Sequence, residues 1–326
     1  MNQGSWRGKV NSCLVGVDIG GTKLAAVVAD TDGQILNKVR QPTESHKGFE
    51  YAIKLIFDMI DQLLHLEQFT RSQVSSIGIS CGGPLDTQTG VVYSPPNLPD
   101  WDAIPLADIV ETEFKIRPVI ENDANAGALA EWRFGAGRGY NHVVFMTMST
   151  GIGAGIVVDG RILHGASDCA GEVGHQVLIP NGPVCGCGNR GCLEAICSGP
   201  AIAKRAQEKI RKNPHTRILD LVDGNIEAIR SEEVLEAAKS ADPLALDLVK
   251  EISFYMGWGI ANLVNIINPE IVLIGTIAVA AGDLLLDPIR RTVLEMSMQR
   301  PGGIVKIMPA QLGQQIGDLA AISLVV

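Results

Sequence analysis

The sequence is poor in charge and contains no long run of apolar residues. Only 19% of its 326 residues are charged while 46% are hydrophobic, a composition typical of a well-packed globular protein rather than a disordered one. The longest uncharged stretch near the C-terminal end is broken by Pro269-Glu270, and each half is too short or too interrupted to span a bilayer. Positive charge is also in the minority, since the net charge is −9. A basic surface for nucleic acid is therefore not expected.

The N-terminal end lacks the features of an export signal. The first 13 residues contain no apolar core of signal-peptide length. The seven cysteines are expected to be reduced thiols, so the sequence predicts a cytoplasmic protein. At 326 residues the chain is too long for one small core and suits two domains of ordinary size.

The two commonest nucleotide-binding fingerprints are missing as well. No G-x-x-x-x-G-K-[ST] loop occurs, and the glycines at 151, 153 and 155 lead into a predicted strand rather than into a helix. These absences argue against a P-loop and against a dinucleotide-binding domain. They do not exclude ATP, which backbone amides and a metal ion can hold in other ways.

What the sequence does contain is a concentrated set of metal-ligand residues within 171–194. The four candidate ligands are His175, Cys185, Cys187 and Cys192. Three thiolates and one imidazole complete a tetrahedral zinc site and leave no position for a catalytic water. The alternative is a set of ordinary buried thiols, and the other cysteines fit it: Cys13, Cys81, Cys169 and Cys197. We therefore predict a structural zinc that holds Glu172, His175 and Glu194 in place.

Two segments about 130 residues apart follow one pattern. Residues 14–28 read as an apolar strand, a glycine turn and a second apolar strand, and residues 143–158 repeat this order. Each segment is followed by an Asp-Gly turn and an Ile-Leu pair. The period is too long for a solenoid. It predicts two related α/β domains that face each other across a cleft.

The turns inside both segments offer backbone N–H groups with few side chains in the way. Such concave amide arrays bind phosphate oxygens. The alternative is a pair of plain β-hairpins in which glycine only supplies the turn. Two matched copies, one of them containing Asp18, favour phosphate binding.

The rest of the pattern alternates between helices and strands. The predicted elements are helices over 53–64, 124–132 and 244–267, strands over 74–80, 118–121 and 271–275, and a small-residue turn over 278–282. Residues 201–242 are predicted to be helical and without chemistry. Asn122-Asp123 stands where a strand enters a helix. Such residues are usually N-caps, but strand ends at a domain crevice are also where α/β proteins bind ligands.

Two of these motifs carry a family resemblance. G-E-V-G-H at 171–175, followed by C-x-C-G-x-x-G-C-x-E at 185–194, resembles the signature of the ROK family of bacterial sugar kinases and sugar-responsive repressors. The other motifs are similar, in order, to those of the actin, hexokinase and Hsp70 superfamily. They are a first phosphate motif at 18–23, a sugar-binding and catalytic segment at 121–125, a second phosphate motif at 149–153 and an adenosine motif at 275–282.

The resemblance implies an α/β fold of two domains, the actin-like ATPase (ribonuclease H-like) fold with a ligand cleft between the domains. The smaller N-terminal α/β domain is expected over 12–122 and is rejoined by a C-terminal helix at about 314–326. The larger domain is expected over 123–313 and carries the zinc loop. A homodimer is also implied.

The resemblance further implies the site. Asp123 would be the general base, and Asp18 would hold Mg²⁺ through water. The nucleotide-binding residues would be Asp18, Gly20, Gly21, Thr22, Lys23, Ser149, Thr150, Gly151, Gly153 and Gly275. The sugar-binding residues would be Gly83, Asn97, Asn122, Asp123, Glu172, His175 and Glu194. His175 would use one ring nitrogen for zinc and the other for the sugar.

The implied activity is ATP-dependent phosphorylation of a hexose, with ATP, Mg²⁺ and a structural Zn²⁺ as cofactors. Glucose is the expected acceptor, and N-acetylmannosamine, N-acetylglucosamine, fructose and allose are the alternatives. A sugar-responsive regulator without catalysis is an alternative of another class. Regulators of this family carry a winged-helix domain before the first phosphate motif, and only 13 residues precede Leu14. Binding to nucleic acid or to a membrane is not expected.

Overall fold

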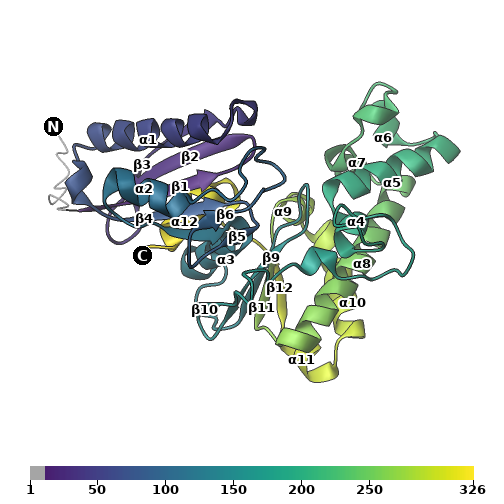
Figure 1. Cartoon of the computed structure of the whole chain (residues 1–326). Coiled ribbons are helices and arrows are strands. Elements are labelled where there is room, and N and C mark those ends of the chain that lie inside the picture. Colours follow the sequence, from purple (N-terminus) through teal and green to yellow (C-terminus); the bar gives the residue numbers. More distant parts are fainter. Residues whose placement is uncertain (1–11) are drawn as a thin grey trace, which may run out of the picture. The chain divides into compact units, whose positions relative to one another are not determined.

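A computed structural model describes residues 12–326 and divides them into two compact units (Figure 1). Unit 1 contains the chain up to Phe134, the segment His164–Cys169 and the C-terminal Gln314–Val326. Unit 2 contains Gly135–Leu163 and Ala170–Gly313. The expectation about an export signal falls mainly on residues 1–11, which lie outside the described residues.

Unit 1 is built on a five-stranded sheet in the order β3-β2-β1-β4-β7. Its strands are β1 (Cys13–Ile19), β2 (Lys23–Ala29), β3 (Ile35–Pro42), β4 (Val74–Cys81) and β7 (Val119–Asn122). β2 pairs antiparallel with both β1 and β3, whereas β4 runs parallel to β1 and β7 parallel to β4. Strands β5 (Leu85–Asp86) and β6 (Val91–Val92) follow β4 in the chain and form a separate two-stranded hairpin.

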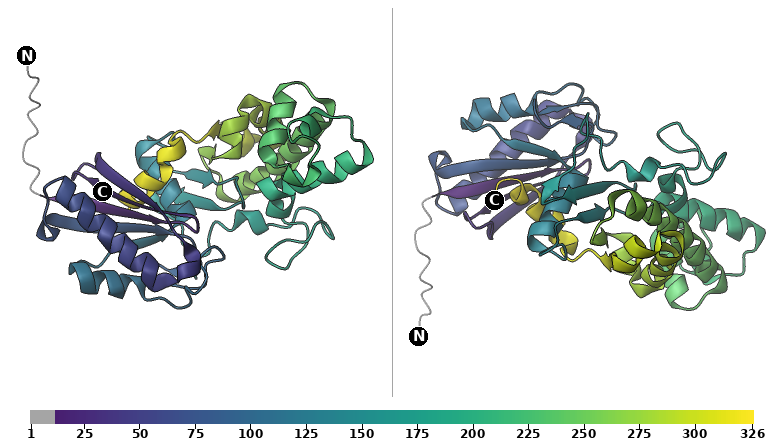
Figure 2. Two further views of the ribbon diagram at one scale, coloured as in Figure 1. Left: turned by 90° about the horizontal axis from the view of Figure 1, so that it is seen from above. Right: turned by 90° about the horizontal axis from the view of Figure 1, so that it is seen from below.

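Helices cover both faces of this sheet, and the period-2 alternation of β1 decides which residues face which layer. The helices are α1 (Phe49–Leu66), α2 (Leu106–Phe114), α3 (Asp123–Phe134) and α12 (Ile316–Ser323), with short 3₁₀ turns at Ser45–Lys47, Arg71–Gln73 and Gly313–Gln315. Val15 and Val17 join the core formed with α1 and α2, whereas Leu14 packs with Ile322 of α12. The views in Figure 2 show α1 and the C-terminal helix α12 on opposite sides of the purple strands.

Helix α12 comes very close to the sheet because glycines face it. A Cβ at Gly78 would lie 2.0 Å from the carbonyl oxygen of Ala321, and a Cβ at Gly16 would lie 3.1 Å from the Ala321 Cβ. Helix α12 also packs on α3, which therefore belongs to unit 1. The structure thus places the boundary after Phe134 rather than at the predicted 122/123 junction, and it adds residues 164–169 to unit 1.

Unit 2 repeats the same sheet. Its strands are β8 (Val143–Met146), β9 (Ala154–Val158), β10 (Arg161–Ile162), β11 (Ile271–Ile274) and β12 (Lys306–Pro309), in the order β10-β9-β8-β11-β12. Again three strands pair antiparallel, and two further strands are added in parallel. The repeat predicted from residues 14–28 and 143–158 is confirmed as a repeat of sheet topology, and the α/β actin-like fold class is confirmed.

The helices of unit 2 pack into one large apolar core with the buried strands β8 and β11. They are α4 (Leu193–Cys197), α5 (Gly199–Lys212), α6 (Arg217–Asp220), α7 (Ser231–Lys239), α8 (Pro243–Ile267), α9 (Ile277–Ala281), α10 (Asp283–Met296) and α11 (Gln299–Ile304), with 3₁₀ turns at Val173–His175 and Ile226–Ala228. Helix α8 ends at Asn268, which has a left-handed φ of 52°. Among residues 12–326, no helix combines the length and the apolarity that crossing a bilayer requires.

One predicted element is wrong. Residues 278–282 were predicted to be a turn because their side chains are small, but 277–281 form the short helix α9. Alanine has the highest helix propensity of all residues, and Gly282 ends the helix with a φ of 59°.

Candidate active site

The glycine turn between β1 and β2 is closed by its own backbone and by a neighbouring threonine. The Gly20 N–H donates to the Lys23 carbonyl at 3.1 Å. The Thr43 hydroxyl donates to the Gly20 carbonyl at 2.6 Å. Gly21 has no room for a side chain, because a Cβ there would lie 2.5 Å from both the Cβ and the carbonyl oxygen of Asn97. The turn predicted to bind phosphate therefore lies directly against the segment predicted to bind sugar.

Asp18 lies at the carboxyl end of β1, next to this turn. The pKa of its carboxyl is raised from 3.8 to about 6. Burial is the largest cause and the Asp123 carboxylate adds to it, while a hydrogen bond with Ser80 and the charge of Lys23 partly offset the rise. Helix α12 touches the same group, since a Cβ at Gly317 would lie 2.6 Å from Asp18 Oδ2. A partly buried carboxylate with a raised pKa gains from a bound cation, so the chemistry of Asp18 fits the expected Mg²⁺.

The junction of β7 with α3 presents Asn122 and Asp123. The Ala124 N–H lies 2.9 Å from Asn122 Oδ1 and 2.8 Å from Asp123 Oδ1, so both side chains cap the start of the helix. Asp123 is nevertheless exposed. Gly83 belongs to the same cluster, because a Cβ there would lie 2.9 Å from Asn122 Nδ2. Unit 1 thus brings together the predicted base, the two loops at Gly83 and Asn122, and Asp18, whose pKa responds to Asp123.

The second glycine turn, between β8 and β9 in unit 2, is stabilised by a hydrogen bond within the turn and by the side chain of Glu194. Inside it, the Ser149 N–H donates to the Gly151 carbonyl at 2.9 Å. From outside, Glu194 Oε2 accepts the N–H of Ile152 at 2.9 Å. A Cβ at Gly151 would lie 2.7 Å from that same carboxylate oxygen. Glu194, which the sequence associates with sugar, therefore also binds the backbone of the second phosphate motif.

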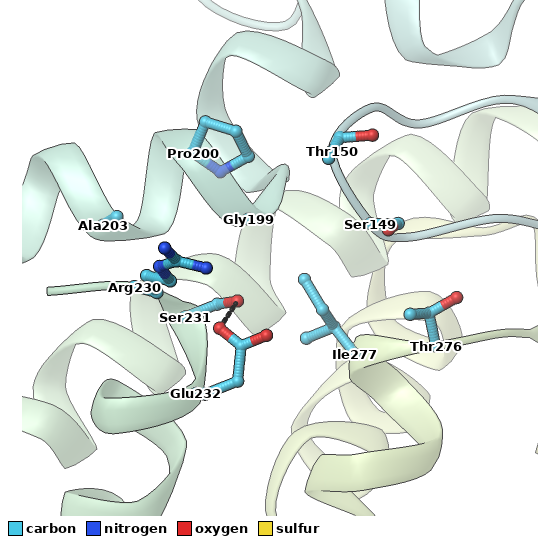
Figure 3. A pocket seen from close by; sticks show the side chains of 10 residues that line it. All are labelled: Ser149, Thr150, Gly199, Pro200, Ala203, Arg230, Ser231, Glu232, Thr276 and Ile277. Carbon is cyan, nitrogen blue, oxygen red and sulfur yellow. Dashed lines mark hydrogen bonds between the residues drawn. The ribbon is translucent and has the colours of Figure 1, made fainter. Parts of the chain in front are cut away.

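A pocket of about 340 Å³ opens beside this turn. It is lined by Ser149, Thr150, Gly199, Pro200, Ala203, Arg230, Ser231, Glu232, Thr276 and Ile277. In Figure 3 the side chains of Arg230, Ser231 and Glu232 approach from one side and the Ser149-Thr150 turn from the other. The second phosphate motif and the residues that follow Gly275 therefore meet at one cavity, as the sequence predicts for nucleotide.

Several pocket residues were missed by sequence reasoning. Residues 201–242 were predicted to be without chemistry, yet Ala203 of α5 and 230–232 at the start of α7 line the cavity. The Gly199 N–H donates to the Ser149 carbonyl at 2.7 Å, which fixes the start of α5 on the turn. Thr276 occupies an unusual backbone conformation with φ 50° and ψ −99°, a region that favours glycine. That strain, which no sequence pattern reveals, lies at the pocket wall.

The four predicted zinc ligands converge. The ligand atoms of His175, Cys185, Cys187 and Cys192 all lie within 4.8 Å of one another. Cys185 Sγ is 3.6 Å from His175 Nδ1, and Cys187 Sγ is 3.8 Å from Cys192 Sγ. A tetrahedral ion with Zn–S of about 2.3 Å and Zn–N of about 2.0 Å separates its ligand atoms by roughly 3.6–3.8 Å. The donor set and its spacing therefore fit zinc.

The two ring nitrogens of His175 face different neighbours. Its Nδ1 faces the thiols, and its Nε2 points the other way, 3.7 Å from Glu172 Oε2. Burial raises the pKa of the Cys185 and Cys192 thiols, the latter to about 12, whereas the backbone N–H of Asn189 lowers that of Cys187. A metal ion would keep all three as thiolates.

Comparison with known proteins decides the family. The model of the ROK family matches residues 14–326. The chain belongs to the ROK family. It is 36% identical over 312 residues to a glucokinase of Thermotoga maritima, an alignment that covers 96% of each chain. A solved ROK family glucokinase from Streptomyces griseus, in complex with glucose and AMPPNP, is 34% identical with a TM-score of 0.79, and 96% of this chain and 99% of that one are covered.

A regulator is similar over the same length. The xylose repressor of Caldicellulosiruptor bescii is 30% identical over 313 residues, which cover 96% of this chain and 78% of the repressor. A glucokinase and a repressor are therefore both similar to nearly the whole of this chain. Family membership alone does not distinguish the two activities, so the activity is argued from the residues of the site.

Proposed function

We propose that this ROK-family chain is an ATP-dependent glucokinase that forms glucose 6-phosphate. The observation that carries the proposal is the 340 Å³ pocket of unit 2, where the glycine turn at Ser149-Thr150 meets Thr276-Ile277. A sensor of sugar alone has no need for a nucleotide-sized cavity beside a phosphate-binding turn. The glucokinases similar to the chain at 34–36% identity support the same activity.

Phosphoryl transfer needs positioning and charge neutralisation more than covalent chemistry. We assign Asp123 as the general base: its carboxylate accepts the proton of the sugar 6-hydroxyl as that oxygen attacks the γ-phosphorus, and the bond to ADP breaks. Its exposure leaves it accessible to a substrate. Asp18 would hold Mg²⁺ through water, and the ion would neutralise charge on the phosphates when bound.

The two glycine turns would bind phosphate oxygens through their N–H groups. This assignment covers Gly20, Gly21, Thr22 and Lys23 in unit 1 and Ser149, Thr150, Gly151 and Gly153 in unit 2. The pocket behind the second turn would take the adenosine, with Thr276 and Ile277, which follow Gly275 in the chain, and residues at the start of α5 and α7 on its walls. Ile277 offers an apolar surface to the base, while Ser231 and Glu232 offer polar atoms.

The sugar-binding assignment follows the family resemblance and covers seven residues. Gly83, Asn97, Asn122 and Asp123 belong to unit 1, and Glu172, His175 and Glu194 belong to unit 2. Zinc on His175 Nδ1 would fix the tautomer in which Nε2 remains available to a hydroxyl. The zinc role is structural, because three cysteines and one histidine fill a tetrahedral shell.

We also propose a homodimer. Phe254, Tyr255 and Trp258 form an aromatic cluster on α8 with ring centroids 5.4–6.4 Å apart, and Phe254 is 43% exposed. Exposed aromatic clusters are enriched at protein interfaces. Analytical ultracentrifugation of the Phe254→Glu variant should yield monomers where the unaltered chain yields dimers.

The activity is tested by ADP release across glucose, mannose, fructose, allose and the N-acetylhexosamines. The expected result is the highest kcat/KM with glucose. A preference for N-acetylmannosamine would replace the substrate and keep the reaction. Absence of ADP release with every sugar, together with normal glucose binding, would favour a regulator without catalysis.

A further inference from the structure

A buried carboxylate lies directly beneath the Asn122-Asp123 turn. Glu121 is the third residue of β7, and its side chain is 7% exposed. Its Oε1 accepts the backbone N–H of Asn122 at 2.8 Å and the side-chain amide of Asn125 at 3.0 Å. One oxygen thus holds the backbone at the point where strand becomes helix.

The other oxygen of Glu121 has a histidine partner from a distant segment. His164 Nε2 lies 2.7 Å from Glu121 Oε2, and the histidine side chain is 38% exposed. His164 opens the segment 164–169, which belongs to unit 1 although the residues on either side of it belong to unit 2. The far end of this segment is held separately, because Asp168 accepts the N–H and hydroxyl of Thr87 at 3.0 and 3.1 Å.

Removing the histidine would leave a buried carboxylate oxygen without this donor. A buried ionised carboxylate is stable only when its oxygens are paired. Without His164, the Glu121 carboxylate would rotate toward another partner for Oε2, and this rotation would weaken the bond from Oε1 to the Asn122 N–H. The orientation of the next residue, Asp123, would then no longer be fixed.

We propose that His164 is a positioning residue for phosphoryl transfer: its Nε2–H donates to Glu121 Oε2, locks Oε1 onto the Asn122 N–H and so orients the Asp123 carboxylate. The inference rests on the proposed role of Asp123. His164 itself acts only through Glu121. Catalysis depends on such orientation because small displacements of a reacting group cost large factors in rate.

The central experiment uses the full chain with His164→Ala. We expect kcat to fall about tenfold or more, while the Kd for glucose changes less than about threefold. Because the ring is partly exposed, added imidazole should enter the vacated space and restore kcat in a saturable way. His164→Gln, which keeps a donor N–H, should retain more activity than the alanine variant.

The matched control is Asp168→Asn, which weakens the other attachment of the same segment. It should leave kcat within about twofold and should not respond to imidazole. Equal loss in both variants would mean that the segment only needs anchoring, and would overturn the inference. A double-mutant cycle with Glu121→Gln should show strongly non-additive effects on kcat; additive effects would also overturn it.

Failure of this inference is distinguishable from failure of the proposed function. If Asp123→Asn loses activity while His164→Ala keeps full kcat, only the role of His164 is wrong. If Asp123→Asn keeps its activity, the base assignment itself is wrong, whatever His164→Ala does. Circular dichroism at the assay temperature establishes that each variant is folded, and for a poorly folded alanine variant the glutamine variant decides.

Discussion

At the scale of single residues, the two aspartates of unit 1 occupy unlike environments. Asp18 is partly buried between β1 and α12, and this burial destabilises its carboxylate unless a cation is bound. Asp123 is exposed at the first turn of α3, where the helix dipole favours its negative charge. This difference suits one residue to charge compensation and the other to proton transfer.

Asp123→Asn should lower kcat at least 100-fold, because an amide cannot accept the sugar proton and a general base contributes about 10²–10⁴. The fold should persist, since asparagine also caps helices well. Steady-state kinetics and glucose titration calorimetry measure both effects. Asp86→Asn is the matched control, because Asp86 also accepts backbone N–H groups in unit 1 but lies at the end of β5. Retention of more than about a tenth of kcat would leave Asp123 as a cap alone.

The raised pKa of Asp18 predicts a pH-dependent stability. A carboxyl whose pKa rises on folding, here from 3.8 to about 6, contributes stability below pH 4 that is lost as the pH rises through 6. Between pH 4 and pH 7.5, ligand-free protein should therefore lose stability relative to Asp18→Asn by up to roughly 3 kcal/mol. Urea unfolding of both proteins without Mg²⁺ or nucleotide measures this. A difference that stays constant or shrinks with rising pH would contradict the burial of Asp18.

At the scale of elements, the loop that carries the predicted zinc ligands is also connected to the second glycine turn. Its ligand Cys192 directly precedes α4, and Glu194 on that helix binds the Ile152 N–H. The same stretch continues to Gly199, whose N–H binds the Ser149 carbonyl. Both ends of the second glycine turn are thus attached to a segment that begins at a predicted zinc ligand.

Cys187→Ser should therefore lower zinc content below one ion per chain and weaken both glucose and AMPPNP binding. Elemental analysis and calorimetry measure the three quantities. Cys169→Ser is the control, because Cys169 is also exposed but lies outside the ligand set. Unchanged AMPPNP affinity in a zinc-depleted Cys187→Ser protein would show that the contact of Glu194 with Ile152 does not depend on the metal.

The pocket wall on α5 allows a test of where the nucleotide lies. Ala203→Phe should fill part of the 340 Å³ cavity and raise the KM for ATP at least about tenfold, with the Kd for glucose unchanged. Lys204→Phe adds the same ring to the exposed side of the same helix and should change neither value. Equal ATP kinetics in both variants would remove the adenosine from this pocket.

The sequence predicted those parts of the site whose residues lie close together in the chain. The glycine turns and the ligands at 175–192 are local patterns, because a turn or a chelating loop needs only its own spacing. The contact between Glu194 and Ile152, 42 residues apart, depends on packing. The pocket walls at Ala203 and 230–232 also depend on packing. Their neighbours Ile202 and Val234 belong to the apolar core, so the local sequence indicates only a helix packed on that core. The sequence did not indicate a role for His164, because the residues directly around it form no motif and its partner Glu121 is 43 residues away.

At the scale of the whole molecule, the repeated sheet is completed by residues far apart in sequence. Unit 1 needs α12 over the face that carries Gly16 and Gly78. In the sequence, the residues of unit 2 stand between the strands of unit 1 and α12. The stability of unit 1 therefore depends on a close backbone approach that only glycine permits.

Gly78→Ala should destabilise the protein by roughly 1–3 kcal/mol or more, because the new methyl group would overlap the Ala321 carbonyl oxygen at 2.0 Å. Thermal unfolding with glucose present and absent measures the change. Gly303→Ala is the matched control, since a Cβ there meets nothing within 4 Å and alanine favours the helix α11. Comparable stability of the two variants would mean that α12 does not pack closely on the sheet.

The position of α12 also governs how the chain folds while it is being made. Domains commonly fold N-terminal first as the ribosome extends the chain at about 5–20 residues per second. Here the strands of unit 1 are complete by Asn122, but the helix that covers their second face starts only at Ile316. At that rate the open face waits roughly 10–40 s for its cover. Most of unit 2 is synthesised during this interval, so the nascent N-terminal sheet keeps an apolar face open that chaperones would need to protect.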